Sequence, residues 1–317
     1  MRPAGAKWLR AGAWAAVLLL AAFAALSIAS RWAAFRDSFS LVDWGASPAA
    51  MAASAVLLAA ALALNPAGWI LVARELGARS PTRGMTAAWF ASQLGRYAPG
   101  KIWLFAGRIG YLKAEGLSLA RAAAASAWEL ILSFASVGLV AGPAVLLSGA
   151  GSLPSSVRAA VIVAAVSAVL LPLLHPVQKL AFRLRGSGEY RGVRVSTALR
   201  AVALYALIWV LRGVSLWLWL TGLGIPSNGL AACAGAAPLS WLAGYIVMVI
   251  PGGIGVREAV TGALVAPPGM LGPVVAAALG QTLLMALLEL ALAFVFFRRA
   301  APGNDGKGGG DAPAAEG

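Results

Sequence analysis

The sequence predicts an all-α polytopic membrane protein: about six full transmembrane helices plus two re-entrant helical hairpins, arranged as an inverted repeat. Three observations lead to this prediction. Of the 317 residues, 61% are hydrophobic and 11% are charged, whereas soluble domains are about half apolar and a quarter charged. The apolar residues gather in stretches of about twenty, the length that crosses ~30 Å of hydrocarbon. Two further apolar stretches are interrupted near their middle by proline and glycine.

Six uninterrupted stretches are long and apolar enough for full spans. They are residues 11–30, 49–72, 119–147, 156–174, 198–222 and 271–297. The first follows residues 1–10, which carry three basic residues and which we expect to be the cytoplasmic N-terminus. A signal peptide is the alternative, but the apolar run is longer than a usual signal core. Residues 300–317 are mainly Gly, Pro and Ala with a few charges, so we expect a disordered cytoplasmic tail.

The two interrupted stretches, residues 84–112 and 230–265, contain the sequences RYAPGKIW and PGGIGVRE. Proline and glycine end a helix there and leave backbone polar groups without partners. Lipid tolerates this only where the broken segment packs in protein or lines a water-filled cavity. We therefore interpret each stretch as a re-entrant hairpin that enters and leaves on one side. Two short full spans per stretch is the alternative, and it leaves the topology of the remaining chain unchanged.

Residues 11–148 and 156–299 predict two membrane repeats with the same order, namely two spans, a hairpin and a closing span. Three full spans is an odd number, so the second repeat must be inverted relative to the first. Proteins built this way often bind their substrate near the membrane midplane, between the repeats and beside broken helices. A chance likeness between Ala- and Leu-rich helices is the alternative.

The distribution of Lys and Arg predicts the orientation. If the N-terminus is cytoplasmic, the inner segments carry fifteen Lys and Arg residues and the outer segments carry three. The inner segments are residues 1–10, 74–83, 175–200 and 298–317, and the outer ones are 31–48, 148–158, 222–229 and 266–272. This asymmetry predicts that both termini lie on the cytoplasmic side of the membrane. The net charge of +14 is thus explained by topology and anionic lipid rather than by nucleic acid.

Several kinds of chemistry are excluded by composition. The single cysteine, Cys233, and the single histidine, His175, rule out a disulfide framework and make zinc sites and catalytic triads implausible. No phosphate-binding loop or dinucleotide-binding fingerprint occurs. The sequence therefore predicts no catalytic residue, no metal and no cofactor, and the expected partners are membrane lipids. A homo-oligomer is left open.

The two breaks are the predicted substrate-binding site. A helix that restarts after each break points its N-terminus into the membrane, where free N–H groups and the helix dipole favour an anion. We expect Arg257 to add a positive charge and Glu258 to pair with it or bind an amine. A mutually neutralising pair in a packed turn is the alternative. The predicted binding residues are Arg96, Tyr97, Pro99, Gly100, Lys101, Pro251, Gly252, Gly253, Gly255, Arg257 and Glu258.

Glu129, Arg212 and Glu289 lie inside predicted full spans and form a predicted intramembrane charge network. A charge at the centre of a membrane helix costs roughly 2.5–3.5 kcal/mol, so these residues must be paired, protonated or hydrated. We expect Arg212 to face one of the two glutamates, and a purely structural ion pair is the alternative. For Arg108, snorkelling to the membrane surface is the alternative to a functional role. Asn65, before Pro66, favours a packing role.

With these two motifs and this span pattern, residues 10–300 resemble the transmembrane region of the lysylphosphatidylglycerol synthase family, the flippase-like integral membrane proteins. The first motif matches from Gly95 to Lys101, and the second from Pro251 to Glu258. The resemblance implies a flippase that carries aminoacylated phosphatidylglycerol from the inner to the outer leaflet. Family members also carry a soluble aminoacyltransferase domain, which we do not expect here. Relatives in isoprenoid, hopanoid and glycolipid pathways widen the range of expected substrates.

We therefore expect a lipid flippase-like transporter that moves a polar lipid, anionic or zwitterionic, between leaflets without a synthase activity. Two alternatives stay open. One is a membrane-embedded enzyme acting on a lipid head group, for which Glu258 is the candidate general base. The other is a non-transporting accessory partner of a separate lipid-modifying enzyme.

Overall fold

The computed structural model describes residues 46–93, 95, 102–147, 192–247 and 253–300. This part of the chain forms eight α-helices and no strand, which confirms an all-α fold. The helices are α3 (Pro48–Glu75), α4 (Thr82–Gln93), α5 (Ile102–Ala114), α6 (Leu119–Leu147), α9 (Val195–Gly222), α10 (Gly229–Ile246), α11 (Val256–Val265) and α12 (Leu271–Ala300). Of the described helices, α3, α6, α9, α10 and α12 are long and apolar enough to cross a membrane. The protein is therefore a polytopic membrane protein.

Four of the six predicted full spans correspond to α3, α6, α9 and α12. The other two, residues 11–30 and 156–174, lie outside the described residues, as do residues 1–10 and the tail after Ala300. The start of α3 follows from local chemistry, because the Ser47 side chain accepts a hydrogen bond from the N–H of Ala50 at 3.4 Å and Pro48 opens the helix. A hydroxyl cap followed by proline is a common helix start.

Each interrupted stretch forms two helices that pack against each other, α4 with α5 and α10 with α11. The predicted helix–break–helix pattern is therefore present in both. The break residues 94, 96–101 and 248–252 lie outside the described residues. The first arm of the second hairpin, α10, has 18 residues and is long and apolar enough to span a membrane by itself. The alternative of short full spans thus stays open for that hairpin.

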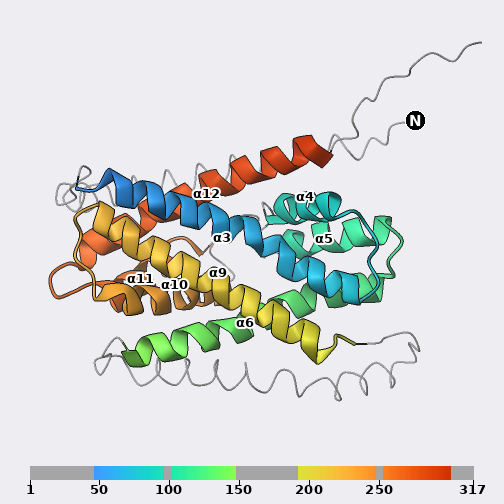
Figure 1. The fold of residues 1–317 in the computed structure, drawn as a ribbon, viewed down its shortest axis with the longest axis horizontal. Coiled ribbons are helices and arrows are strands. Elements are labelled where there is room, and N and C mark those ends of the chain that lie inside the picture. The colour runs from blue at the N-terminus through green and yellow to red at the C-terminus, as the bar shows by residue number, and fades with distance from the viewer. Residues whose placement is uncertain (1–45, 94, 96–101, 148–191, 248–252, 301–317) are drawn as a thin grey trace, which may run out of the picture.

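The two hairpins lie toward opposite ends of the long helices (Figure 1). The pair α4 and α5 enters from one end, α10 and α11 enter from the other, and in each pair the helix ends next to the break lie toward the middle of the bundle. Backbone hydrogen bonds join Ser47 to Gly222 at 3.1 Å and Asn228 to Val265 at 2.9 Å, so these helix ends meet at one end of the molecule. This is the arrangement that an inverted repeat requires.

The first long helix of each described half, α3 and α9, shows the same local pattern. Both have 28 residues. A left-handed glycine follows each, Gly77 at φ +100 and Gly224 at φ +64, and the N–H of the next residue donates back to a helix carbonyl at 2.9 Å. Glycine is favoured there because a Cβ makes this helix-ending conformation costly. The hairpins then begin at the same spacing, α4 at Thr82 and α10 at Gly229.

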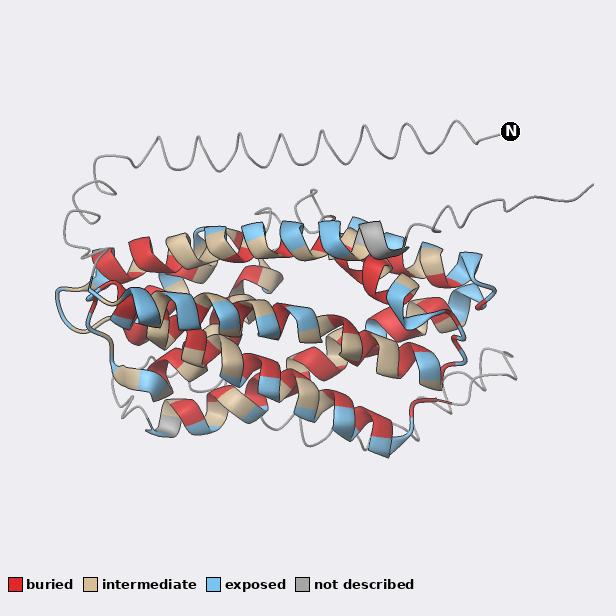
Figure 2. Cartoon of the chain, turned by 45° about the horizontal axis from the view of Figure 1, so that its top comes forward, coloured by how far each residue is buried: buried red, intermediate tan, exposed pale blue. Residues whose placement is uncertain are grey.

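The helices α3 and α9 run antiparallel through the centre and share the largest interface between described helices. Fully buried Ser54 and Ser215 bond reciprocally, each hydroxyl donating to the other residue's carbonyl oxygen at 2.7 and 2.9 Å. Such small hydroxyl residues let membrane helices approach closely and hold them together. Buried residues gather on the sides of the helices that face one another, and exposed residues cover the outside (Figure 2).

The basic residues on the surface of the described bundle are gathered at one end. These residues lie at the end where α4 and α5 enter, and the described part of the opposite end has no Lys or Arg. They are Arg74, Arg79, Arg83, Lys113, Arg121, Arg194 and Arg200. At that end Arg194 forms an ion pair with Glu75 at 2.6 Å. The charge distribution that predicted the topology therefore coincides with the two ends of the fold.

The contact between α9 and α10 generates a stability prediction. A Cβ at Gly213 would lie 2.5 Å from the Cα atom of Ala234, so Gly213→Ala must push the two helices apart. Overpacking of this kind costs about 1–3 kcal/mol, and we expect a lower midpoint of thermal unfolding in detergent. Gly110→Ala is the matched control, because nothing lies within 4 Å of its Cβ position. Equal midpoints for the two variants would contradict the close packing of α9 on α10.

Candidate functional site

A cavity of about 100 Å³ lies in the middle of the bundle, between the two hairpins. All eight described helices contribute to its lining. The lining includes Gln93, the last residue of α4, and Arg257, near the start of α11. Five charged residues line it, namely Arg108, Glu129, Arg212, Arg257 and Glu289. The sequence predicted a polar site between the repeats, and the structure places a charged cavity there.

A second cavity of about 40 Å³ adjoins the first, and Arg212 and Arg257 line both. It lies further toward the end where α10 and α11 enter. On α3 its lining residue is Leu58 rather than Leu62, and on α9 it includes Leu216, one turn beyond Arg212. Its polar residues are Ser240, Glu258, Thr261, Gln281 and Thr282. The two cavities therefore follow one another along the length of the bundle.

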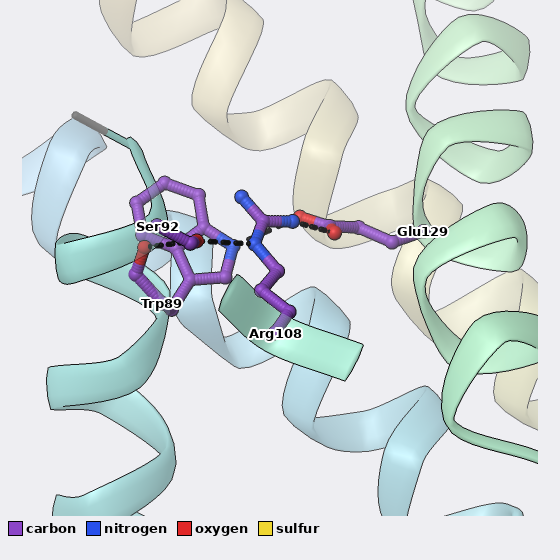
Figure 3. A network of polar contacts seen from close by, with 4 residues as sticks. All are labelled: Trp89, Ser92, Arg108 and Glu129. Atoms are coloured by element: carbon purple, nitrogen blue, oxygen red, sulfur yellow. Dashed lines mark hydrogen bonds and ion pairs between the residues drawn. The ribbon is translucent and has the colours of Figure 1, made fainter. Parts of the chain in front are cut away.

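Arg108 and Glu129 form a buried ion pair at the first hairpin (Figure 3). The side chain of Arg108 is 2% exposed, and its Nε atom donates to the Ser92 hydroxyl at 2.8 Å. The Trp89 indole N–H donates to the second Glu129 oxygen at 2.9 Å. The Arg108 guanidinium also lies 4.8 Å from the centre of the Trp89 ring, within range of a cation–π contact.

This pair bears on two expectations. Arg108 does not snorkel to the surface but is buried, and its contacts hold α4, α5 and α6 together. Glu129 pairs with Arg108 on the hairpin, so Glu289 is the glutamate that Arg212 is left to face. The physical reason is depth: the hairpin carries Arg108 inward from the surface to the level of Glu129, and a sequence does not reveal how deeply a re-entrant helix enters.

At the second hairpin, Glu258 caps the helix that restarts after the break. Its side chain is 2% exposed. One carboxylate oxygen accepts from the N–H of Gly255 at 2.5 Å and the other from the Thr282 hydroxyl at 2.6 Å. A glutamate that bonds back to the residue before its helix is half of a capping box. Both oxygens of Glu258 therefore have hydrogen-bond donors within the protein.

The glycines of the second break serve backbone packing. Gly253 has a φ of +70 and is buried against Gly244, so a Cβ at Gly253 would lie 2.7 Å from Gly244 backbone atoms. Gly255 has a φ of +93, which a residue with a Cβ rarely adopts. Gly253, one of the predicted binding residues, is thus approached closely by α10.

Arg212 and Arg257 converge from different helices on one side chain, that of Met285 on α12. The Nη2 atom of Arg212 lies 3.1 Å from the Met285 sulfur, and that of Arg257 lies 3.9 Å from it. Arg212 also lies 5.1 Å from the centre of the Trp209 ring. The aliphatic stem of Arg257 packs on Gly244, where a Cβ would come within 2.5 Å of the Arg257 Cγ atom.

The sequence missed part of the site. Trp209, Trp241 and Tyr245 line the central cavity as an aromatic wall, with ring centres 5.1 and 5.4 Å apart along it. One sequence feature could have revealed this wall. Trp209 stands in the middle of a predicted span, whereas membrane tryptophans usually lie at span ends. Asn65, which we assigned to packing, also lines the cavity, and its amide donates to the Ala61 carbonyl at 2.9 Å.

Other predicted site residues lie outside the described part of the chain. They are Arg96, Tyr97, Pro99, Gly100, Lys101, Pro251 and Gly252. Residues on either side of the first break, Gln93 and Leu104, line the central cavity. Glu289 is 5% exposed and lines it too, together with Arg212. Among the described residues, no group of three or more His, Cys, Asp or Glu side chains could hold a metal ion.

The buried ion pair generates a second prediction. Arg108→Gln leaves Glu129 buried without its cation, and breaking such a pair from one side costs about 3–5 kcal/mol. We expect a large drop in the midpoint of thermal unfolding, partly restored in the double variant Arg108→Gln/Glu129→Gln. The control is Lys113→Gln, an exposed residue on the same helix. If Arg108→Gln melts where Lys113→Gln does, the pair does not stabilise the hairpin.

Comparison with known proteins does not assign this chain to a family: no family model, no curated protein and no solved structure matches it. Its function has to be argued from the site itself.

Proposed function

We propose that the protein is a lipid flippase-like transporter that moves a polar lipid, anionic or zwitterionic, between the two leaflets. The head group passes through the central cavity while the acyl chains stay in the surrounding lipid. The observation that supports this most directly is the position of Arg212, Arg257 and Glu289 around a cavity in the middle of apolar helices.

Charged side chains inside a membrane bundle cost free energy, and they commonly mark the pathway of a substrate or an ion. Together the linings contain three arginines and three glutamates. Arg108 and Glu129 hold the first hairpin, and Glu258 caps the second. Arg212, Arg257 and Glu289 line the central cavity, where they place two cations suited to a phosphate and one anion suited to an amine. Guanidinium groups match phosphate oxygens in geometry and charge. A zwitterionic head group would also leave the formally neutral interior neutral.

The size of the cavity bears on the mechanism. About 100 Å³ is well below the roughly 300–1,000 Å³ of typical small-molecule pockets. A lipid head group can therefore pass only if the helices around the cavity move. Hairpins that enter from opposite ends and are directed toward one cavity suit such gating, because each can open toward its own side of the membrane.

The enzyme alternative finds less support. It required Glu258 as a general base, yet both oxygens of Glu258 accept hydrogen bonds from Gly255 and Thr282. These contacts are those of a helix cap, and they give the carboxylate a structural role that needs no reaction. The accessory-partner alternative is tested by transport itself, because it predicts that variants in the cavity leave transbilayer lipid movement unchanged.

The resemblance to the transmembrane region of lysylphosphatidylglycerol synthases agrees with this proposal, and it stays a prediction. We further propose a bacterial inner membrane as the location, with both termini in the cytoplasm. A separate lipid-modifying enzyme would supply the lipid. Transport would run down the lipid gradient or be coupled to an ion, since no phosphate-binding loop occurs in the sequence.

The function is tested by transbilayer movement of head-group-labelled lipids in liposomes that contain the purified protein. We expect Arg212→Gln and Arg257→Gln each to slow the movement of the transported lipid by about tenfold or more, since each removes a charge-assisted contact. The matched control is Arg200→Gln, an exposed residue near the start of the same helix as Arg212. Equal rates for all four proteins would contradict the proposal.

Orientation is tested by thiol labelling in intact cells, in a Cys233→Ala background that has no other cysteine. Arg79→Cys and Pro226→Cys place exposed thiols at the basic and the opposite end of the bundle. We expect a membrane-impermeant maleimide to label the residue at 226 from outside and to reach the residue at 79 only after lysis. The reverse labelling pattern would invert the proposed topology.

A further inference from the structure

The two cavities meet at a contact between two arginines and a methionine. Arg212 comes from α9, Arg257 from α11 and Met285 from α12. Both arginines line both cavities, whereas Met285 lines only the second and is 3% exposed. The two cavities therefore share these two arginines, and Met285 contacts both of them.

The contact is chemically mismatched. A guanidinium N–H is a strong, charged donor, and a thioether sulfur is a weak acceptor. Two such donors, one from each arginine, are turned toward the same sulfur, at 3.1 and 3.9 Å. Phosphate oxygens accept charge-assisted hydrogen bonds that are about twice as strong as neutral ones. A phosphate at this point would therefore compete successfully with the sulfur for both donors.

The arginines are also held in place by their surroundings. The stem of Arg257 lies on Gly244, and the guanidinium of Arg212 lies over Trp209. Met285 is the more adaptable partner, because an unbranched thioether side chain has three rotatable bonds and refills space readily. If one member of the contact moves when a ligand arrives, it is the methionine.

We propose that Met285 is a displaceable plug between the two cavities, and that the Nη2 atoms it contacts on Arg212 and Arg257 form a binding site for a phosphate group. The proposal rests on the proposed function and deepens it, because it names phosphate as the recognised chemistry and a single side chain as the barrier. The phosphate comes from a lipid head group, and free inorganic phosphate is the other source of the same chemistry.

Equilibrium binding to the purified full chain in non-ionic detergent tests this directly. The probes are short-chain phosphatidylglycerol and phosphatidylethanolamine, a diacylglycerol of the same chain length without phosphate, and inorganic phosphate. The proteins are wild type, Met285→Ala, Met285→Ala/Arg257→Gln and the control Leu284→Ala. Leu284 is half-buried beside Met285 but lines neither cavity. Should Met285→Ala fold poorly, Met285→Val removes less volume and is expected to give a smaller change of the same sign.

We expect Met285→Ala to lower the Kd for at least one phospholipid by about two- to tenfold, the range that corresponds to removing one or two competing hydrogen bonds. Leu284→Ala should bind like wild type, and adding Arg257→Gln should abolish the gain. Unchanged affinity in Met285→Ala would overturn the plug. Equal binding of the phosphate-free lipid would overturn the phosphate site, and inorganic phosphate that binds as tightly as the phospholipids would overturn the lipid source.

Transport assays separate this inference from the function on which it rests. In one outcome, Met285→Ala changes phospholipid binding but the wild type moves no lipid across the bilayer. This outcome would support the phosphate site and contradict the flippase function. Lipid movement that depends on Arg212 and Arg257 but not on Met285 would retain the flippase and remove the plug.

Discussion

Two helices that stop in the middle of a membrane protein impose the constraint on which this structure depends. Their backbone polar groups and nearby charges need partners within the protein, because lipid supplies none. At the second break, Glu258 caps the new helix and Thr282 anchors that carboxylate to α12. At the first, Arg108 and Glu129 neutralise each other and bind the hairpin to α6. These partners lower the free-energy cost of polar groups around the cavity between the hairpins, in a fold that is otherwise apolar.

The two halves share a plan but have diverged where they meet. The long helices α3 and α9 have equal length and similar ends, and Asn65 and Arg212 occupy the same place counted from the first residue of each. Both residues line the central cavity. One half thus contributes a neutral amide and the other a cation at equivalent positions. The equivalent helices α3 and α9 both line the cavity, and Arg212 in place of an amide adds a positive charge on the α9 side.

The sequence was sufficient to predict the helices and hairpins, but it did not reveal which charged side chains contact one another. Apolar length located α3, α6, α9 and α12, and the Pro-Gly breaks located both hairpins, because span length and helix-breaking chemistry are local properties. The partner of Glu129 is not local, since it depends on how far Arg108 is carried inward. Met285 had no signal, because a methionine in an apolar helix is ordinary until two arginines are seen to converge on it. Side chains from separate helices meet only in three dimensions.

Convergence of Arg212 and Arg257 has an electrostatic consequence that favours selectivity. Two like charges directed at one point repel, and the repulsion is strong where water is scarce. Glu289 and Glu258, which line the adjoining cavities, moderate this field. An arriving anion relieves the repulsion and gains hydrogen bonds from both sides, whereas an uncharged head group does neither. A cation would increase the repulsion. Under the proposed function, this arrangement would favour an anion at the point where the two arginines converge.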